Sequence, residues 1–321
     1  MQLGIAITWP DEAREIGPAV ARLACAAEAA GVDDLWAADH FFQIPITGLP
    51  REAPMLEAYA ALGFVAGMTR RIRLGALVTA VPYRHPGVLI KSVTALDVLT
   101  GGRMALGVGA GWDREEAAAL GIPFPPTAER FERLEELLRI AHQMWRGDEA
   151  PFVGRHHRLD RPLNSPGALQ RPHPPILIGG GGERKTLRLV AQYADACNLF
   201  DFAGRFEFDL EHKLRVLRDH CRAVGRDYDE IEKTVAIGLD LRTDPSGGVR
   251  RLVERLRELA AIGIQHAIVG PLPRWDDAGL AALAMAVPEV HAIQVAPLRR
   301  LGADGHRPDA PTASDAASGL T

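Results

Sequence analysis

The sequence predicts an α/β protein, a single (β/α)8 TIM barrel, from three observations. Short apolar runs alternate with longer stretches of helical periodicity along almost the whole chain. Eight such pairs fit within about 300 residues, which is the usual size of this barrel. The apolar runs are nearly continuous, as parallel strands covered on both faces are. A doubly wound open sheet shares this alternation and is the structural alternative.

Each of the eight apolar runs, taken as a strand, precedes a stretch of helical periodicity. The expected strands are residues 3–8, 34–38, 73–80, 104–108, 174–178, 194–199, 234–241 and 266–269, and the expected helices are 18–30, 55–68, 86–99, 128–145, 184–192, 210–223, 249–262 and 278–286. Gly31 and Gly101 follow the first and third helices, where glycine commonly terminates a helix. Because each helix carries the chain back between two strands, the strands are expected to be parallel.

Residues 151–160 interrupt the alternation and predict a β-hairpin insertion with its turn at Gly154. The hairpin contains the adjacent pair His156 and His157. Adjacent residues of an extended segment point to opposite faces, so we interpret the pair as a surface feature rather than a metal site. The barrel is expected to span residues 1–300, and the polar, aperiodic residues 301–321 predict a disordered tail.

The composition disfavours several classes of partner. The 321 residues include 37 Lys and Arg against 41 Asp and Glu, a formal net charge of −4. This balance gives no electrostatic reason to expect a nucleic acid or an anionic membrane as a partner. No apolar run approaches the roughly 20 residues of a membrane span, and the N-terminus lacks a signal-peptide pattern. We therefore expect a soluble, cytoplasmic protein that acts on a small molecule.

The spacing of the cysteines and the absence of several motifs argue against some kinds of site and enzyme. Cys25, Cys197 and Cys221 are far apart and form no CxxC pattern, so we expect buried or part-buried free thiols in a reducing cytoplasm. The sequence contains no P-loop, HExxH or GxSxG motif, which argues against a P-loop enzyme, a zincin and an α/β-hydrolase. We expect no metal centre.

The residues that follow the strands are the functional candidates, because (β/α)8 barrels carry their chemistry at the C-terminal ends of the strands. Asp39 and His40 follow the second expected strand, and an acid beside an imidazole suits proton transfer. The alternative is that Asp39 caps a loop and His40 lies in water. After the third strand, Thr79 and Tyr83 offer hydroxyl groups to a ligand. Arg84 offers a guanidinium group to an anion, although a proline-bounded turn is the simpler interpretation of that residue.

Two glycine-rich segments follow the fourth and fifth expected strands. The first, residues 107–111, resembles a GxGxxG motif only superficially, and a plain turn explains it equally well. The second, Gly179 to Gly182, directly precedes an expected helix. A tight turn needs one or two glycines rather than four, whereas bare amides at a helix N-terminus bind phosphate. We therefore predict a phosphate-binding loop at the second segment.

Together, these segments resemble the luciferase-like monooxygenase superfamily, in its branch of coenzyme F420-dependent oxidoreductases. The resemblance runs from about residue 4 to residue 298 and rests on AAEAAGVDDLWAADHF (26–41), RIRLGALVTAVPYRHPGVLIKSVTALDVLTGGRMALGVGAGW (71–112), GIPFPPTAERFERLEE (121–136) and NSPGALQRPHPPILIGGGGERKTLRLVAQYADACN (164–198). It implies a (β/α)8 barrel with insertion segments at the C-terminal face, and a flavin or 5-deazaflavin whose ring lies at the bottom of that end.

The resemblance also implies roles for individual residues. Asp39 and His40 are expected near the ring, and a non-prolyl cis peptide is expected near Leu77 and Val78, behind the ring. The further residues expected to contact the ring and the phosphate are Thr79, Gly109, Ala110, Gly111, Gly179, Gly180, Gly181 and Gly182.

One position departs from the family pattern. In the deazaflavin-dependent sugar-phosphate dehydrogenases a glutamate assigned as proton donor directly follows the glycine turn, where this chain has Trp112. Glu115 and Glu116 lie one helical turn further on and are expected to point elsewhere. The difference argues against glucose-6-phosphate as substrate. It suggests an apolar pocket wall formed by Trp112 and Tyr83, suited to an unsaturated or cyclic substrate.

The hypothesis that follows is hydride transfer between C5 of coenzyme F420 and a small enone, imine or alcohol. His40 is the expected proton donor or acceptor, held by Asp39 or by a backbone group. Arg84, Arg184 and Lys185 are candidates for the anionic tail of the cofactor. Family members are often dimers, so the resemblance also suggests a homodimer.

Three alternatives remain open from the sequence. The first is a luciferase-like monooxygenase that uses reduced FMN and oxygen, because FMN shares the ring and the ribityl phosphate with the deazaflavin. The second is a barrel that binds flavin without catalysis. The third is an unrelated phosphate-binding barrel such as a sugar-phosphate aldolase or isomerase, although no lysine stands at a recognised strand end to form a Schiff base.

Overall fold

The computed structural model describes residues 1–202, 209–240 and 244–298, and within them the chain forms a closed parallel barrel. The barrel strands are β1 (Gln2–Ala6), β2 (Asp34–Ala37), β3 (Arg73–Ala76) with its continuation β4 (Thr79–Ala80), β5 (Met104–Gly109), β8 (Ile176–Gly179), β9 (Ala196–Asp201), β10 (Glu232–Asp240) and β11 (His266–Leu272). All neighbouring pairs are parallel, and the pairing of β3 with β5 closes the sheet. The predicted (β/α)8 barrel is confirmed, and an open sheet is excluded.

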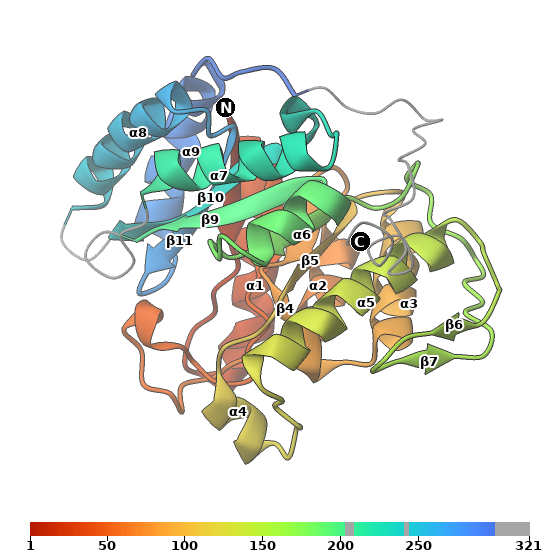
Figure 1. Ribbon diagram of the computed structural model, residues 1–321. Helices are drawn as coiled ribbons and strands as arrows, with labels where there is room; N and C mark the ends of the chain where they lie inside the picture. Colours follow the sequence, from red (N-terminus) through yellow and green to blue (C-terminus); the bar gives the residue numbers. More distant parts are fainter. Residues whose placement is uncertain (203–208, 241–243, 299–321) are drawn as a thin grey trace.

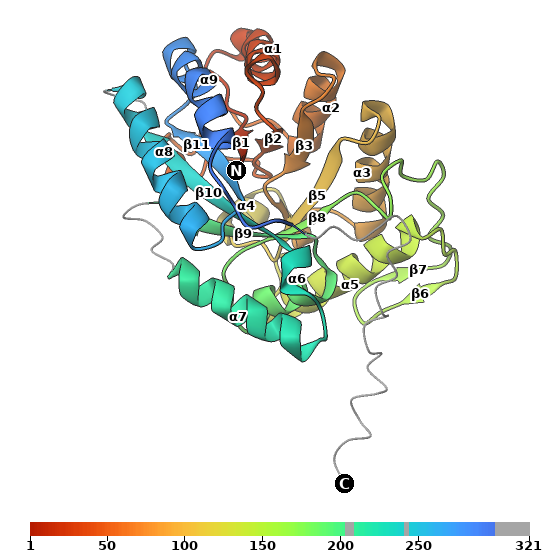
Figure 2. The ribbon, with the colours of Figure 1, turned by 90° about the horizontal axis from the view of Figure 1, so that it is seen from above.

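A ring of helices surrounds the strands, as the view from above shows (Figures 1 and 2). These helices are α1 (Ala13–Ala30), α2 (Ala58–Met68), α3 (Pro86–Thr100), α5 (Thr127–Trp145), α6 (Thr186–Tyr193), α7 (Leu210–Ala223), α8 (Pro245–Ala261) and α9 (Asp277–His291). Each matches an expected helix. Gly31 and Gly101 end α1 and α3 in the left-handed conformation, as the sequence predicts. The tail expected at 301–321 lies outside the described residues.

Two local features differ from the expected strand and helix pattern. The third expected strand, 73–80, is divided into β3 and β4, and the peptide between Leu77 and Val78, in the gap, is cis, at the place that the family resemblance implies. The chain rejoins the sheet when Thr79 pairs with Val108. A short helix that the sequence analysis did not anticipate, α4 (Arg114–Ala119), follows β5. The 3₁₀ turns η1 (Pro45–Thr47), η2 (Val81–Tyr83) and η3 (Tyr228–Glu230) complete the connections.

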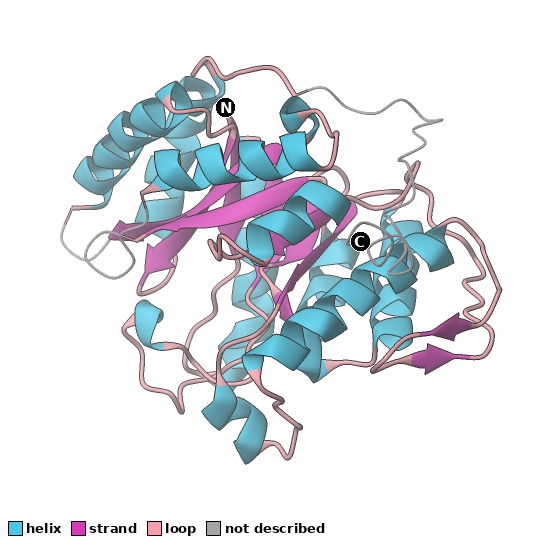
Figure 3. Cartoon of the chain, in the orientation of Figure 1, coloured by secondary structure: helices cyan, strands magenta, loops and turns pink. Residues whose placement is uncertain are grey.

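The predicted hairpin is present as the antiparallel pair β6 (Phe152–Val153) and β7 (Arg158–Leu159), at the edge of the molecule (Figure 3). The interpretation of His156 and His157 as a surface feature is wrong. Their side chains are only 11% and 9% exposed, and both pair with carboxylates of α5. Residues 155–157 form the turn rather than an extended strand, so both rings can face α5. Glu136 fixes this turn by accepting hydrogen bonds from three successive backbone N–H groups.

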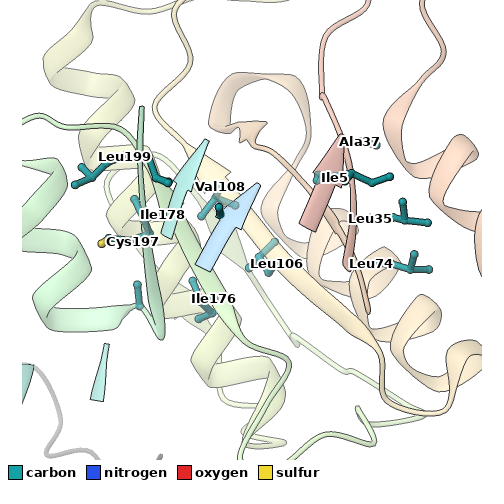
Figure 4. Packing of buried hydrophobic residues seen from close by; sticks show 14 of the residues in the cluster. Ile5, Leu35, Ala37, Leu74, Leu106, Val108, Ile176, Ile178, Cys197 and Leu199 are labelled. Carbon is teal, nitrogen blue, oxygen red and sulfur yellow. The ribbon is translucent and has the colours of Figure 1, made fainter. Parts of the chain in front are cut away.

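Side chains of alternating strand positions build the core on both sides of the sheet. Leu106, Val108, Ile176 and Ile178 belong to the large apolar cluster between strands and helices (Figure 4). Inside the barrel, Trp36 packs with Leu177, Ala196 and Ile268. Gly75 has to lack a side chain because a Cβ there would lie 2.4 Å from the indole. The barrel is therefore filled rather than open along its axis.

Four charged residues lie together at the N-terminal ends of the strands. Asp34 contacts the Nε2 atom of His266 at 3.1 Å and the Nη2 atom of Arg73 at 2.9 Å. Glu232 lies 3.4 Å from the other ring nitrogen of His266. Burial alone would lower the pKa of His266, but Asp34 and Glu232 raise it to about 10. The cluster pairs two carboxylates with two cations, of which Arg73 is partly exposed, at the end of the barrel opposite to Asp39 and His40.

Two further sequence expectations concern thiols and membranes. Cys197 and Cys221 are buried free thiols as expected, but Cys25 is exposed, because it lies on the outer face of α1. Among the described helices, none combines the length and the apolarity required to span a bilayer.

The charge cluster predicts how stability depends on pH. The folded pKa of His266 is raised from 6.5 to about 10, so its contribution is complete below about pH 6.5 and is lost as pH rises towards 10. Replacing His266 with Asn should cost about 3–5 kcal/mol at acidic to neutral pH, because it leaves buried carboxylates unpaired, and the cost should shrink above pH 9. Urea denaturation of wild type and variant from pH 6 to 10 measures this, with the half-buried surface residue His212 replaced by Asn (His212→Asn) as control.

Candidate functional site

Asp39 and His40 both follow β2, as predicted, but their side chains have different partners. Asp39 is 1% exposed, and its carboxylate accepts hydrogen bonds from both terminal nitrogens of Arg84. Burial raises the pKa of Asp39, and the hydrogen bonds from Arg84 oppose this effect. Glu57 also accepts from Arg84. The expectation that Asp39 holds His40 is wrong, because the Asp39 carboxylate is occupied by the guanidinium group.

A chain of contacts runs from Arg84 through Tyr59 to Thr79. The Arg84 guanidinium lies over the ring of Tyr59, 4.7 Å from the ring centroid, and the Tyr59 hydroxyl is 2.8 Å from Thr79 Oγ1. With Asp39 and Glu57 as its ion-pair partners, Arg84 is already neutralised. These contacts disfavour Arg84 as a ligand for the anionic tail of a cofactor.

His40 is held by Glu116, a residue of α4. The Nδ1 atom of His40 lies 2.9 Å from Glu116 Oε2. The carboxylate also accepts hydrogen bonds from the backbone N–H of Phe41 and Phe42, at 2.5 and 2.8 Å, and from the hydroxyl of Tyr83. Although burial alone raises the pKa of Glu116, the hydrogen bonds from His40 and Tyr83 lower it to about 2. Glu116 is therefore a buried carboxylate at neutral pH.

The expectation that Glu116 points elsewhere is wrong, although the sequence contains a partial signal for its position. Asp113-x-x-Glu116 matches a capping box, in which the glutamate side chain turns back to the N-cap backbone. Asp113 does cap α4 by accepting from the Glu116 N–H. The Glu116 side chain instead crosses to the loop after β2, a contact that depends on the closure of the barrel.

Asp113, at the start of α4, makes a second link to the loop after β2. Its carboxylate accepts two hydrogen bonds from Arg51, at 3.0 and 3.1 Å. Donor atoms of His40, Asp113 and Glu116 lie within 4.8 Å of one another, close enough to bind a metal ion. Each carboxylate oxygen of Glu116 and Asp113 already accepts at least one hydrogen bond. This arrangement favours a hydrogen-bonded network over a metal centre.

The two predicted pocket residues both lie beside His40. The ring of Trp112 is 59% exposed and lies 5.2 Å from the imidazole, tilted by 55°. Tyr83 contacts the ring of Phe41 at 5.1 Å and reaches His40 through Glu116. An exposed indole next to an imidazole provides an apolar surface adjoining a group that can transfer a proton.

The predicted glycine contacts lie at the same end of the barrel, but packing explains two of them. A Cβ at Gly109 or Gly179 would lie 3.0 or 2.9 Å from Val78 Cγ2. Gly111 and Gly180 have φ values of 75° and 120°, which side chains rarely adopt. The backbone N–H of Gly180 donates to Asn198 O, and the Ala110 carbonyl accepts from Arg130. Because α6 begins at Thr186, a short turn separates Gly182 from the helix.

A comparison with protein families matches residues 1–246 to the model of the luciferase-like monooxygenases. The chain belongs to this family. The match covers most of the barrel, including β2, the cis peptide and the glycine segments after β5 and β8.

Curated relatives support the assignment. A protein of Nakamurella multipartita named F420-dependent glucose-6-phosphate dehydrogenase is 32% identical over 72% of this chain and 66% of its own length. A protein of the same name from Kineococcus radiotolerans is 32% identical over 71% of this chain and 65% of its own. The aligned region thus spans slightly less than two thirds of these relatives. An uncharacterized protein of Mycobacterium tuberculosis is 30% identical over 73% of this chain and 77% of its own.

Solved structures show the same fold at low sequence identity. An F420-dependent secondary alcohol dehydrogenase in complex with an F420–acetone adduct superposes with a TM-score of 0.74 and 18% identity, covering 90% of this chain and 98% of that one. The coenzyme F420-dependent tetrahydromethanopterin reductase of Methanopyrus kandleri gives a TM-score of 0.71 and 17% identity, covering 92% and 100%. These similarities establish the barrel architecture of the family.

The glycine packing leads to a prediction on stability. Gly179→Ala should destabilise the fold by about 1–3 kcal/mol, the usual cost of overpacking, because the new methyl group would collide with Val78. Adding Val78→Ala should relieve that collision and recover part of the loss. Denaturant titrations of the two single variants and the double variant measure the coupling. Gly167→Ala is the control, because a Cβ there meets nothing within 4 Å; equal stabilities for Gly179→Ala and Gly167→Ala would contradict the packing explanation.

Proposed function

We propose that this protein is a coenzyme F420-dependent oxidoreductase that transfers a hydride between the cofactor and a small enone, imine or alcohol. The observation that carries the proposal is the His40 imidazole, 12% exposed at the C-terminal end of the barrel and hydrogen-bonded to a buried carboxylate. Two relatives and two structural neighbours are named as F420-dependent enzymes, which supports the same cofactor.

The residues at this end of the barrel fit a flat ring with polar edges. Gly270 shares the inward face of β11 with His266 and Ile268, and a Cβ there would meet only the Ile237 carbonyl oxygen, at 4.0 Å. Asn198 of β9 is fully buried; its Nδ2 atom donates to Thr234, and its Oδ1 atom has no hydrogen-bond partner among the described residues. Open space and an unsatisfied acceptor are what a ring with N–H groups would use.

When bound, coenzyme F420 gives or takes a hydride at C5 of its deazaflavin ring. The residues proposed to hold it are Leu77, Val78, Thr79, Gly109, Ala110, Gly111 and Gly179 to Gly182. His40 is proposed to give a proton to the substrate heteroatom or take one from it. Trp112 and Tyr83 are proposed to cover the substrate and exclude water. Asp39, paired with Arg84, is proposed to fix the loop that carries His40.

The test compares binding and turnover. Purified protein is titrated with F420 and with FMN, with cofactor fluorescence as the readout, and the reduced F420 complex is then assayed on enones, imines and ketones. Wild type should bind F420 more tightly than FMN and turn over at least one substrate class. His40→Ala should still bind F420 but lose about 10²–10⁴ in kcat, the usual contribution of general acid–base catalysis.

His291→Ala, on α9, is the matched control and should behave as wild type. Preference for FMN with oxygen consumption coupled to product formation would favour the monooxygenase alternative. F420 binding without turnover of any substrate would favour a non-catalytic binding barrel. Binding of neither cofactor would refute the proposal and return attention to phosphate-binding barrels. Wild-type turnover by His40→Ala across pH would remove the role of His40.

We also propose that the protein is a homodimer, as the family resemblance suggests. Helix α2 contains no charged residue, and its outward Phe64 and Met68 are 42% and 46% exposed. A helix that is apolar all round is normally covered on both faces. A cytoplasmic location remains a prediction from the sequence.

A dimer formed through α2 should dissociate when a single charge is introduced on the outer face of that helix. Light scattering should give a dimer mass for wild type and a monomer mass for Phe64→Glu, because a carboxylate buried in an apolar interface is strongly unfavourable. Arg250→Glu, an exposed position of α8, should leave the dimer intact. A monomeric wild type, or a variant Phe64→Glu that remains dimeric, would contradict the proposal.

A further inference from the structure

We infer that Glu116 is the positioning residue of His40: it fixes the imidazole as the tautomer protonated at Nδ1 and leaves Nε2 to exchange a proton with the substrate. The catalytic part of this inference rests on the proposed function. The tautomer is a property of the protein alone, so it can be tested independently of cofactor and substrate.

The hydrogen bonds around Glu116 determine where the proton on His40 lies. Its carboxylate faces three groups that can only donate here, the N–H of Phe41, the N–H of Phe42 and the hydroxyl of Tyr83. An ionised carboxylate only accepts hydrogen bonds. The fourth neighbour, His40 Nδ1 at 2.9 Å, must therefore carry a hydrogen. In a neutral imidazole the other nitrogen, Nε2, is then the acceptor.

Glu116 positions the main chain of this loop as well as the ring. The two amides that it binds belong to the two residues directly after His40. Its own place is fixed at the start of α4, where Asp113 accepts from the Glu116 N–H and is held in turn by Arg51. One fully buried carboxylate thus sets both the orientation of the imidazole and the path of the peptide that carries it.

The other acidic groups near His40 are not available for this role. Asp39, its chain neighbour, pairs with Arg84, and Asp113 pairs with Arg51. Glu116 also carries the charge that offsets an imidazolium ion whenever His40 holds a second proton.

The decisive experiment is the tautomer of His40 in the wild-type protein. Long-range ¹H–¹⁵N correlation spectra of ¹⁵N-labelled protein, recorded at a pH where the ring is neutral, distinguish protonated from bare ring nitrogens. The signal of His40 is identified among the eleven histidines by its loss in His40→Ala. The expected result is a protonated Nδ1 and a bare Nε2. The opposite tautomer would overturn the inference, and no variant of Glu116 is needed for this result.

Variants then test the catalytic consequence. In Glu116→Gln the amide NH₂ has to face hydrogen-bond donors, so the Nε2-protonated tautomer should appear and kcat should fall by about 10²-fold, with a smaller change in KM. Tyr83→Phe removes one donor and keeps the other three, so it should retain the wild-type tautomer. The exposed neighbour Glu115 supplies the matched control, Glu115→Gln, which should resemble wild type in both measurements.

The outcomes separate this inference from the proposed function. Folded Glu116→Gln with wild-type tautomer and kcat would refute the positioning role. If the wild-type protein binds no F420 but shows the Nδ1-protonated tautomer, the proposed function fails, whereas the assignment of Glu116 as the group that orients His40 holds.

Discussion

The carboxylate of Glu116 joins two loops that follow different strands of the barrel. It accepts hydrogen bonds from the ring of His40, from two backbone amides of the loop after β2 and from the hydroxyl of Tyr83. A buried carboxylate is stable only when donors replace the water it has lost. Satisfying this one group therefore brings the loop after β2, the 3₁₀ turn after β4 and the start of α4 to fixed positions. The candidate site is a consequence of that requirement.

A second constraint acts where the chain passes from β3 to β4. The strand is interrupted between Ala76 and Thr79, where the Leu77–Val78 peptide is cis, and the side chain of Val78 occupies the space beside Gly109 of β5 and Gly179 of β8. Glycine at these two positions is thus required by packing within the barrel wall.

The charged residues are arranged differently at the two ends of the barrel. At the N-terminal end, Asp34, Glu232, His266 and Arg73 form a closed set around the barrel axis, with Trp36 above them. At the C-terminal end, the charged pairs surround His40, whose ring retains some exposure and borders the exposed indole of Trp112. Removing one member of a set of paired buried charges is strongly destabilising, whereas the His40 imidazole keeps some contact with solvent.

The sequence by itself determined the barrel, the order of its strands and helices, and the strand ends at which polar residues gather. It did so because hydrophobic periodicity and helix-ending glycines are local properties of the chain. The resemblance located the cis peptide at Leu77–Val78 and made Trp112 a candidate, and position along the chain made candidates of Asp39, His40 and Tyr83. Local pattern failed at His156 and His157, where a turn replaced the extended segment, and at α4, which is too short to show periodicity.

Only the tertiary structure decided which of these residues act together. Sequence neighbours suggested that Asp39 holds His40, yet Asp39 pairs with Arg84, 45 residues away, and His40 pairs with Glu116, 76 residues away. Hydrogen-bond partners at such separations depend on how strands meet when the barrel closes, and no local pattern encodes that geometry. The physical reason is the cost of an unsatisfied buried carboxylate, which selects partners in space rather than along the chain.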